Sequence, residues 1–201
     1  MKKTILTEED FKESVANHTL TIHQDDGVFR HLVMQKDKEF HMKYEITTWP
    51  GYLCISGDMG CFVFQRLKDM FEFHRKKDYT IDFYYWAQKV QAGDVRRFST
   101  KVVAQHLTED YEYLKEDALE KEKFDENIDL NCYIRRADDV FSHAEACDLL
   151  NELYKEFGSS FEDYSEYDFT EFTFHFIWCC YAVCHAIKEY DAVKTANLQV
   201  Q

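Results

Sequence analysis

Apolar and polar residues alternate along five short segments in the first third of the chain. Such alternation places successive side chains on opposite faces of a β-strand. The segments are Thr19–His23, Val28–Met34, Phe40–Ile46, Tyr52–Ser56 and Cys61–Phe64. The connections between them are too short for the crossover that parallel strands require. The pattern therefore predicts an antiparallel meander of about five strands.

Turn residues separate these segments at the expected places. Residues 25–27 (Asp-Asp-Gly) have the composition of a tight turn. Trp49–Tyr52 carries Pro and Gly at the two central positions of a type II turn. The last two strands are joined through residues 57–60 (Gly-Asp-Met-Gly), so each strand boundary coincides with a turn signal.

Helical spacing marks three stretches in the first half and three in the second. Those in the first half are Thr7–Asn17, Leu67–His74 and Asp82–Gly93, and those in the second half are Ser99–Lys123, Ser142–Gly158 and Phe172–Lys194. Residues 124–139 form a connection that leaves open a short strand or a helical turn. The last stretch is apolar on nearly all sides as far as Ile187, which is typical of a central buried helix.

These elements predict an α+β fold. An N-terminal antiparallel sheet packs against helices, and the second half is mostly helical. We place the sheet with its helices in residues 1–98 and an acidic helical half in residues 99–201. The two parts are expected to pack as one domain, because 201 residues suit a single core.

Composition favours a folded chain in a reducing compartment. With 45% hydrophobic and 16% aromatic residues, the chain can build a packed core. It has no apolar run of about 18 residues, the length of a membrane span, and its start lacks the apolar core of a signal peptide. The seven cysteines include no CxxC pair, which favours small buried thiols over the alternative of a zinc site. We therefore expect a cytoplasmic protein with no metal and no cofactor.

The negative charge is concentrated in the second half. Residues 1–105 hold 16 Lys and Arg against 15 Asp and Glu, whereas residues 106–201 hold 8 against 23. The net charge of −14 therefore arises beyond residue 105. A surface this acidic repels phosphates, so direct binding to nucleic acid is disfavoured.

Four blocks resemble a family of bacteriophage and prophage proteins in which DDG-(F/Y)-RHL, TWPG…GDMG and a C-terminal WCCYA recur. The blocks are HQDDGVFRHL (23–32), TWPGYLCISGDMGCFVFQRLKDMFEFHR (48–75), YYWAQKV (84–90) and FTFHFIWCCYAVCHAIKEYD (172–191). The resemblance covers most of the chain. It implies a phage origin and a small accessory protein in the host cell, and it implies no catalytic residue.

The most polar cluster surrounds the first predicted hairpin turn. It comprises His23, Asp25, Asp26, Arg30 and His31. Two acids and two imidazoles on adjoining strands suit a divalent metal or an acid–base pair. The alternative is turn chemistry, with Arg30 paired to a neighbouring carboxylate. No motif assigns a catalytic residue, and His23, Asp26 and His31 are the candidates here.

A second candidate site is the turn Ser56–Gly60, whose glycines let a ligand approach the backbone. Asp58 lies at its tip, and Trp49 from the adjoining turn would complete the mouth of a site. A plain hairpin turn is the alternative, since the stretch lacks the lysine of a phosphate loop. Cys54 and Cys61 flank the turn, and we expect them to be structural rather than nucleophilic.

The stretch 162–171 interleaves carboxylates with aromatic residues. Aromatic anchors among carboxylates suit an interface with a basic protein, and spaced carboxylates can imitate DNA phosphates. The expected partner-binding residues are Glu162, Asp163, Tyr164, Glu166, Tyr167 and Trp49. The alternative is a helix start capped by Asp168, with Glu171 completing the capping box.

The leading functional hypothesis is a non-enzymatic phage accessory protein that binds a host macromolecule through its acidic half. A basic host protein, such as a nucleic-acid-binding defence protein, is the expected partner, and no membrane is expected. One alternative is an enzyme or small-ligand binder at the turns His23–His31 and Ser56–Gly60. Another is a phage structural or assembly protein, and a homodimer stays open.

Overall fold

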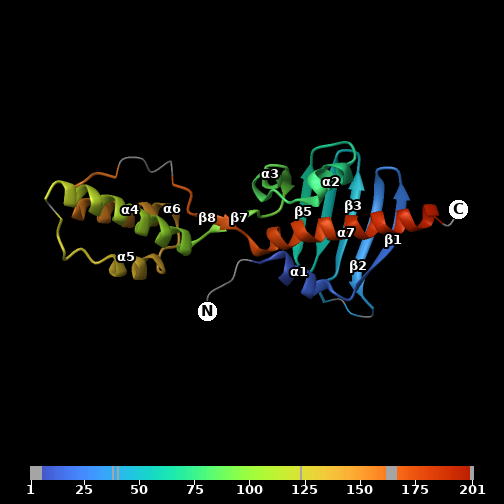
Figure 1. Cartoon of the computed structure of the whole chain (residues 1–201), viewed down its shortest axis with the longest axis horizontal. Helices are drawn as coiled ribbons and strands as arrows, with labels where there is room; N and C mark the ends of the chain where they lie inside the picture. Colours follow the sequence, from blue (N-terminus) through green and yellow to red (C-terminus); the bar gives the residue numbers. More distant parts are fainter. Residues whose placement is uncertain (1–5, 38, 40, 123, 162–166, 200–201) are drawn as a thin grey trace. The chain divides into compact units, whose positions relative to one another are not determined.

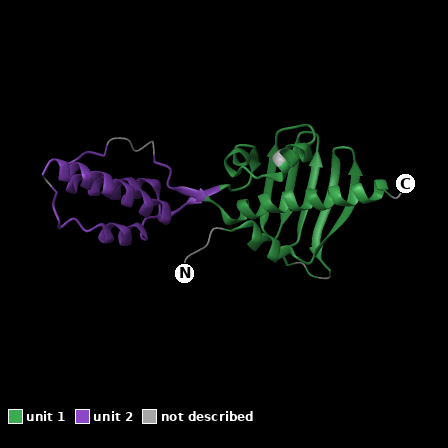
Figure 2. Ribbon diagram, in the orientation of Figure 1, with its two compact units in different colours: residues 1–95, 172–201 green, residues 96–171 purple. Residues whose placement is uncertain are grey.

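The computed structural model describes residues 6–37, 39, 41–122, 124–161 and 167–199. The chain divides into two compact units, which are residues 1–95 with 172–201 and residues 96–171 (Figure 2). We call the first the sheet unit and the second the acidic unit. The division differs from the predicted boundary at residue 98, because the C-terminal helix belongs to the sheet unit.

The sheet unit contains a six-stranded antiparallel sheet in the order β1-β2-β3-β4-β5-β6. The strands are β1 His18–Asp26, β2 Phe29–Lys36, β3 Tyr44–Trp49, β4 Tyr52–Gly57, β5 Gly60–Gln65 and β6 Val90–Ala92. The α+β class and the meander are confirmed. The sixth strand was not predicted, because three residues are too few for a pattern of alternation. β3 begins later than predicted, since Met42 has a φ of +58° and is not extended.

Register places one face of the sheet in the core. Leu32 of β2 pairs with Ile46 of β3, which pairs with Ile55 of β4, which pairs with Phe62 of β5. All four side chains are buried. Their neighbours along each strand point to the opposite, outer face, as the period of two requires.

Helices cover the inner face of this sheet. α7 (Phe174–Gln199) runs across the strands, and α1 (Glu8–Val15) lies beside it (Figure 1). α2 (Met70–Tyr79) and α3 (Phe83–Ala87) complete the layer. Residues on all sides of α7 are buried as far as Tyr190, which confirms the predicted central helix. None of the helices in the described part of the chain combines the length and apolar character that crossing a membrane requires.

The acidic unit is built from three helices and a core of its own. The helices are α4 (Thr100–Glu120), α5 (Leu130–Ala137) and α6 (His143–Glu156), and a short β7 (Arg96–Phe98) pairs with β8 (Thr170–Phe172). Ser99 and Ser142 cap α4 and α6 as predicted. The stretch 124–139, left open by the sequence, contains α5. Leu107, Leu150 and Leu153 are fully buried between the helices.

Gly57, at the end of β4, is a position where a side chain cannot be accommodated. Its φ is +153°, and a Cβ atom would lie 2.2 Å from the carbonyl oxygen of Lys43. That carbonyl accepts the N–H of Asp58, so it cannot simply move away. Gly57→Ala is therefore expected to lower the free energy of unfolding by roughly 2–3 kcal/mol in urea titration.

Gly27 supplies the matched control for this substitution. Its φ is +59°, but nothing lies within 4 Å of the position of a Cβ atom. Gly27→Ala should cost only about 1 kcal/mol, the strain of a left-handed alanine. Equal losses for the two variants would contradict the steric explanation.

Candidate protein-binding surface

The polar residues of the first hairpin do not assemble into one site. His23 and His31 stack with ring centroids 5.1 Å apart, and Nε2 of His31 lies 3.0 Å from Oε2 of Glu45. Asp25 instead accepts hydrogen bonds from Tyr190 and Lys194. Within the described residues, no group of three or more His, Cys, Asp or Glu is placed to hold a metal ion.

Arg30 serves as a structural anchor rather than a member of that cluster. Its guanidinium donates two hydrogen bonds of 2.8 Å to the two carboxylate oxygens of Asp69. The charge also lies over the ring of Phe71, 4.4 Å from its centroid. The pairing with a carboxylate follows the turn-chemistry alternative, although Asp69 is distant in sequence.

Strand topology keeps the two predicted turn sites apart. In an antiparallel meander successive turns lie at alternating ends of the sheet. The turn 26–29 and the turn at Trp49–Tyr52 lie at one end, and the turn 57–60 lies at the other. The length of β4 separates the ends by roughly 17 Å. Asp58 and Trp49 therefore do not form a common mouth, and Asp58 does not meet His23, Asp26 or His31.

The predicted partner-binding residues are only partly visible in the structure. Glu162, Asp163, Tyr164 and Glu166 lie outside the described residues. Trp49 belongs to the sheet unit, where its half-buried ring stacks on Tyr52 at 5.3 Å. Tyr167 packs on Phe169 in the acidic unit.

Tyr167 is held in place by a polar contact as well. Its hydroxyl donates a hydrogen bond of 2.8 Å to Oδ2 of Asp110. Burial raises the pKa of this half-buried carboxyl, against the lowering effect of the Tyr167 and Tyr154 hydroxyls. Burial also raises the pKa of Tyr167. The ring is thus part of the unit's own packing.

The alternative explanation of the 168–171 acids as a helix start is wrong. Asp168 pairs with Arg96 at 2.7 Å and accepts the N–H of Thr170. Glu171 pairs with Arg97 across the β7–β8 ribbon, also at 2.7 Å. α7 begins later, where Oγ1 of Thr173 accepts the N–H of Phe176. Both acids therefore stabilise the short ribbon.

Charge separates the two units more sharply than the sequence halves did. The sheet unit holds 15 Lys and Arg against 17 Asp and Glu, a balance of −2. The acidic unit holds 9 against 21, a balance of −12. Almost all excess negative charge therefore belongs to a 76-residue helical unit, residues 96–171.

One face of α4 presents a row of carboxylates. Its exposed members, spaced three or four residues apart, are Glu109, Glu112, Glu116 and Glu120. Among the described residues Glu112, Glu116 and Glu120 make no ion pair, and Glu109 lies 3.9 Å from Nδ1 of His106. The row is therefore largely uncompensated.

A groove with a cavity volume of about 320 Å³ runs beside the junction of α5 and α6. Its lining residues are Arg136, Asp139, Val140, Glu145, Asp148, Leu149 and Glu152. Arg136, the single cation of the lining, is paired with Glu152 at 2.5 Å. Asp139 and Asp148 make no ion pair with any described residue, so the groove keeps an excess of negative charge.

Phe141 stands next to this groove with its side chain in solvent. It is 79% exposed, the largest exposure among the described large hydrophobic residues. Its N–H donates a hydrogen bond of 2.7 Å to Oε2 of Glu145, which fixes its backbone beside the groove. An exposed aromatic ring among carboxylates suits a protein contact.

Sequence reasoning did not identify Phe141. A large apolar residue directly before an N-cap such as Ser142 is usually explained as a staple against the helix it precedes. Its exposure shows that it makes no such contact. The position before a cap is therefore the signal, but only burial separates a staple from a free anchor.

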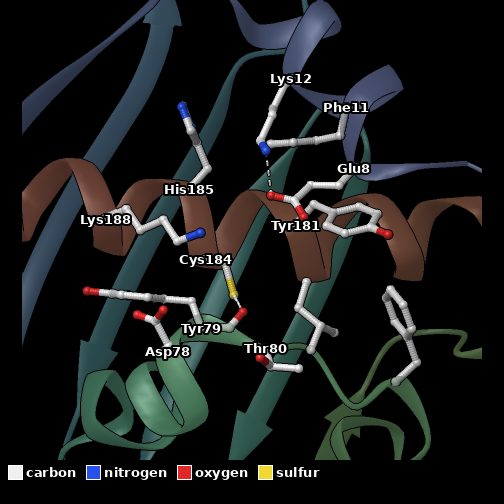
Figure 3. A pocket seen from close by; sticks show the side chains of 12 residues that line it. Glu8, Phe11, Lys12, Asp78, Tyr79, Thr80, Tyr181, Cys184, His185 and Lys188 are labelled. Carbon is white, nitrogen blue, oxygen red and sulfur yellow. Dashed lines mark hydrogen bonds and ion pairs between the residues drawn. The ribbon is translucent and has the colours of Figure 1, made fainter.

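The sheet unit has a cavity of its own between α1, α7 and the segment 78–83 (Figure 3). Its volume is about 320 Å³. Glu8 and Lys12 pair across one side at 2.8 Å, and Lys188 stands opposite with its ammonium 5.0 Å from the centroid of the Tyr79 ring (Figure 3). Asp78 adds a second carboxylate, so the four charges of the lining cancel. The cavity therefore favours neither an anionic nor a cationic ligand.

Comparison with known proteins adds no function to this picture. No protein-family model, curated protein or solved structure matches the chain. The chemistry of the surface therefore rests on the chain's own residues. Of the features described, the groove with Phe141 combines an apolar anchor with uncompensated charge.

Proposed function

We propose that this chain is a non-enzymatic binding protein whose acidic unit docks onto a basic surface of another protein. The observation that carries the proposal is the exposed ring of Phe141 beside a groove that holds unpaired Asp139 and Asp148. The balance of −12 over the same unit supports it. Neither catalytic chemistry nor a bound cofactor is required.

The charges and the ring have different tasks in this proposal. The field of the unit attracts a cationic partner over several ångströms and speeds the encounter. The ring of Phe141 then inserts into an apolar depression of the partner, where its burial contributes about 1.5–3 kcal/mol. Partners that lack either a basic rim or such a depression are rejected.

The partner class follows from the charge and from the resemblance to phage proteins. Proteins that bind nucleic acids carry broad basic surfaces, which the α4 carboxylate row would meet. A host protein of this kind, acting in defence or in nucleic-acid metabolism, is the partner we propose. The chain would then act as an inhibitor by occupying the surface that phosphates otherwise bind.

The proposal predicts a salt-sensitive complex that depends on the groove. Immobilised wild-type chain should retain a basic protein from bacterial lysate in 0.15 M salt and release it near 1 M, where the Debye length falls from about 8 Å to about 3 Å. Once that protein is purified, Asp139→Lys with Asp148→Lys should abolish its binding. Phe141→Ala should weaken it about tenfold or more, measured by calorimetry.

Two further variants control for charge alone. Glu13→Lys with Glu72→Lys makes the same charge change at exposed positions of the sheet unit, and it should leave the affinity nearly unchanged. Glu162→Lys, Asp163→Lys and Glu166→Lys together test the acids that the sequence singled out. If the groove variants bind as the wild type does, the groove is not the docking site; if all charge variants bind equally, the proposed function fails.

A further inference from the structure

Cys54 and Cys61 lie side by side on the outer face of the sheet. Cys54 pairs in register with Val63, and Cys61 pairs with Ser56, so the two cysteines are diagonal neighbours across β4 and β5. Their sulfur atoms are 3.8 Å apart. Cys61 is exposed and Cys54 is half-buried, which leaves the pair open to solvent.

The other thiols of the chain have different surroundings. Cys147, Cys179, Cys180 and Cys184 are buried in the two cores, and Cys132 is exposed in α5. Among the free cysteines, only the Cys54–Cys61 pair combines a sulfur–sulfur contact with access to solvent in the described structure. The expectation that both are merely structural does not account for this exposure.

The distance between the two sulfurs corresponds to a known coordination geometry. Zinc is held by thiolates at about 2.3 Å in a tetrahedron, which places two sulfurs of one centre about 3.8 Å apart. The observed separation is the same. We propose that Cys54 and Cys61 form a two-thiolate site for a soft divalent cation of the Zn²⁺ type.

The electrostatics of the pair favour such a ligand. Burial raises the pKa of the Cys54 thiol to about 11, and the neighbouring Cys61 raises it further in the same direction. Two adjacent thiolates repel each other, and a divalent cation between them removes that repulsion. Binding exchanges two protons for one cation: two S–H groups and M²⁺ give M(S)₂ and two H⁺.

The rest of the coordination sphere is open. Among the described residues no third His, Cys, Asp or Glu joins the pair to complete a metal-binding group. Glu45, in the row next to Ser56, is already bound to Lys43 and His31. Water therefore occupies the remaining positions, and the thiolates select a soft cation over Mg²⁺ or Ca²⁺. The site belongs to the sheet unit and does not depend on the proposed function of the acidic unit.

Cadmium is the probe for this site, because it is thiophilic and its thiolate complexes absorb in the ultraviolet. Reduced full-length chain is dialysed against micromolar Cd²⁺ at pH 8 with a thiol-free reductant, and bound metal is counted. The wild type should hold one Cd²⁺ per chain more than Cys54→Ser or Cys61→Ser, with the thiolate absorption lost in both. Cys132→Ser, the exposed-cysteine control, should match the wild type.

A second reagent keeps the test independent of folding defects and of weak surface sites. Phenylarsine oxide bridges two close thiols, PhAsO and two S–H groups giving PhAs(S)₂ and water. One arsenic adduct per native chain is expected by mass spectrometry, absent from both serine variants and present in Cys132→Ser. Cadmium and arsenic uptake that is unchanged in Cys61→Ser would overturn the site, as would their loss in Cys132→Ser.

Discussion

Replacing Asp69 by Asn is expected to destabilise the sheet unit by about 3–5 kcal/mol, because it breaks a buried ion pair on one side only. Arg30 is 7% exposed, and Asp69 accepts both of its terminal N–H groups. Asn offers one oxygen and turns an amide N–H₂ toward the guanidinium. The positive charge would then stay buried against Phe71 without a counter-charge.

Urea unfolding at pH 7 measures this loss, with two reference variants beside it. Arg30→Met with Asp69→Leu replaces the whole pair by apolar groups, and it should recover most of the stability. Glu8→Gln breaks the exposed Glu8–Lys12 pair and should cost at most about 1 kcal/mol. A loss below 1 kcal/mol for Asp69→Asn would show that solvent reaches the Arg30 charge.

This ion pair illustrates what could be anticipated from the sequence. The hairpin that carries Arg30 follows from alternation and turn residues, which are local signals. A carboxylate partner for Arg30 was one of the two interpretations of that hairpin. Its identity was out of reach, since Asp69 is 39 positions away and several nearer acids were equally suitable.

The candidate site followed the same division between local and long-range information. The concentration of acids beyond residue 105 was visible by counting, and the structure narrows it to residues 96–171. The return of α7 to the sheet unit was not visible, because an all-round apolar helix indicates burial without naming the surface that buries it. Phe141 was missed for a related reason, since exposure is a property of packing.

The turn sites show how topology overrides composition. Gly, Asp, His and Trp gather in the turns between residues 23 and 60, and such residues suit either function or tight turns. Once the strands form a meander, the turns alternate between two ends of the sheet. Proximity in sequence then separates Trp49 from Asp58 in space. By contrast, Cys54 and Cys61 meet because one turn joins their strands.

Lowering the pH from 7.5 to 4.5 is expected to remove about 2.5 kcal/mol of stability through His74 alone. The residue is fully buried among Phe64, Phe73 and Trp86, and burial lowers its pKa from 6.5 to about 4. Nδ1 lies 2.9 Å from the carbonyl oxygen of Met70, and Nε2 is buried without a partner. The imidazole is therefore held neutral in the folded state.

The sign of the effect follows from where the proton binds. Between pH 6.5 and 4 the unfolded chain protonates His74 and the folded chain does not, so unfolding takes up a proton. Stability from this group is thus fully present above pH 6.5 and falls as the pH approaches 4. His185, whose pKa is also lowered by burial, adds loss of the same sign, so only a comparison between variants isolates His74.

His74→Phe should make the difference in unfolding free energy between pH 7.5 and 4.5 smaller by about 2.5 kcal/mol than in the wild type. Phe73→Leu perturbs the same aromatic cluster without removing a titrating group, so its pH dependence should match the wild type at lower overall stability. An equal pH dependence in His74→Phe and the wild type would mean that His74 is solvated or paired in the folded state. In that case the cluster of Phe64, Phe73 and Trp86 would have to open to water, and the inner layer between α2 and the sheet would be looser than its burial indicates.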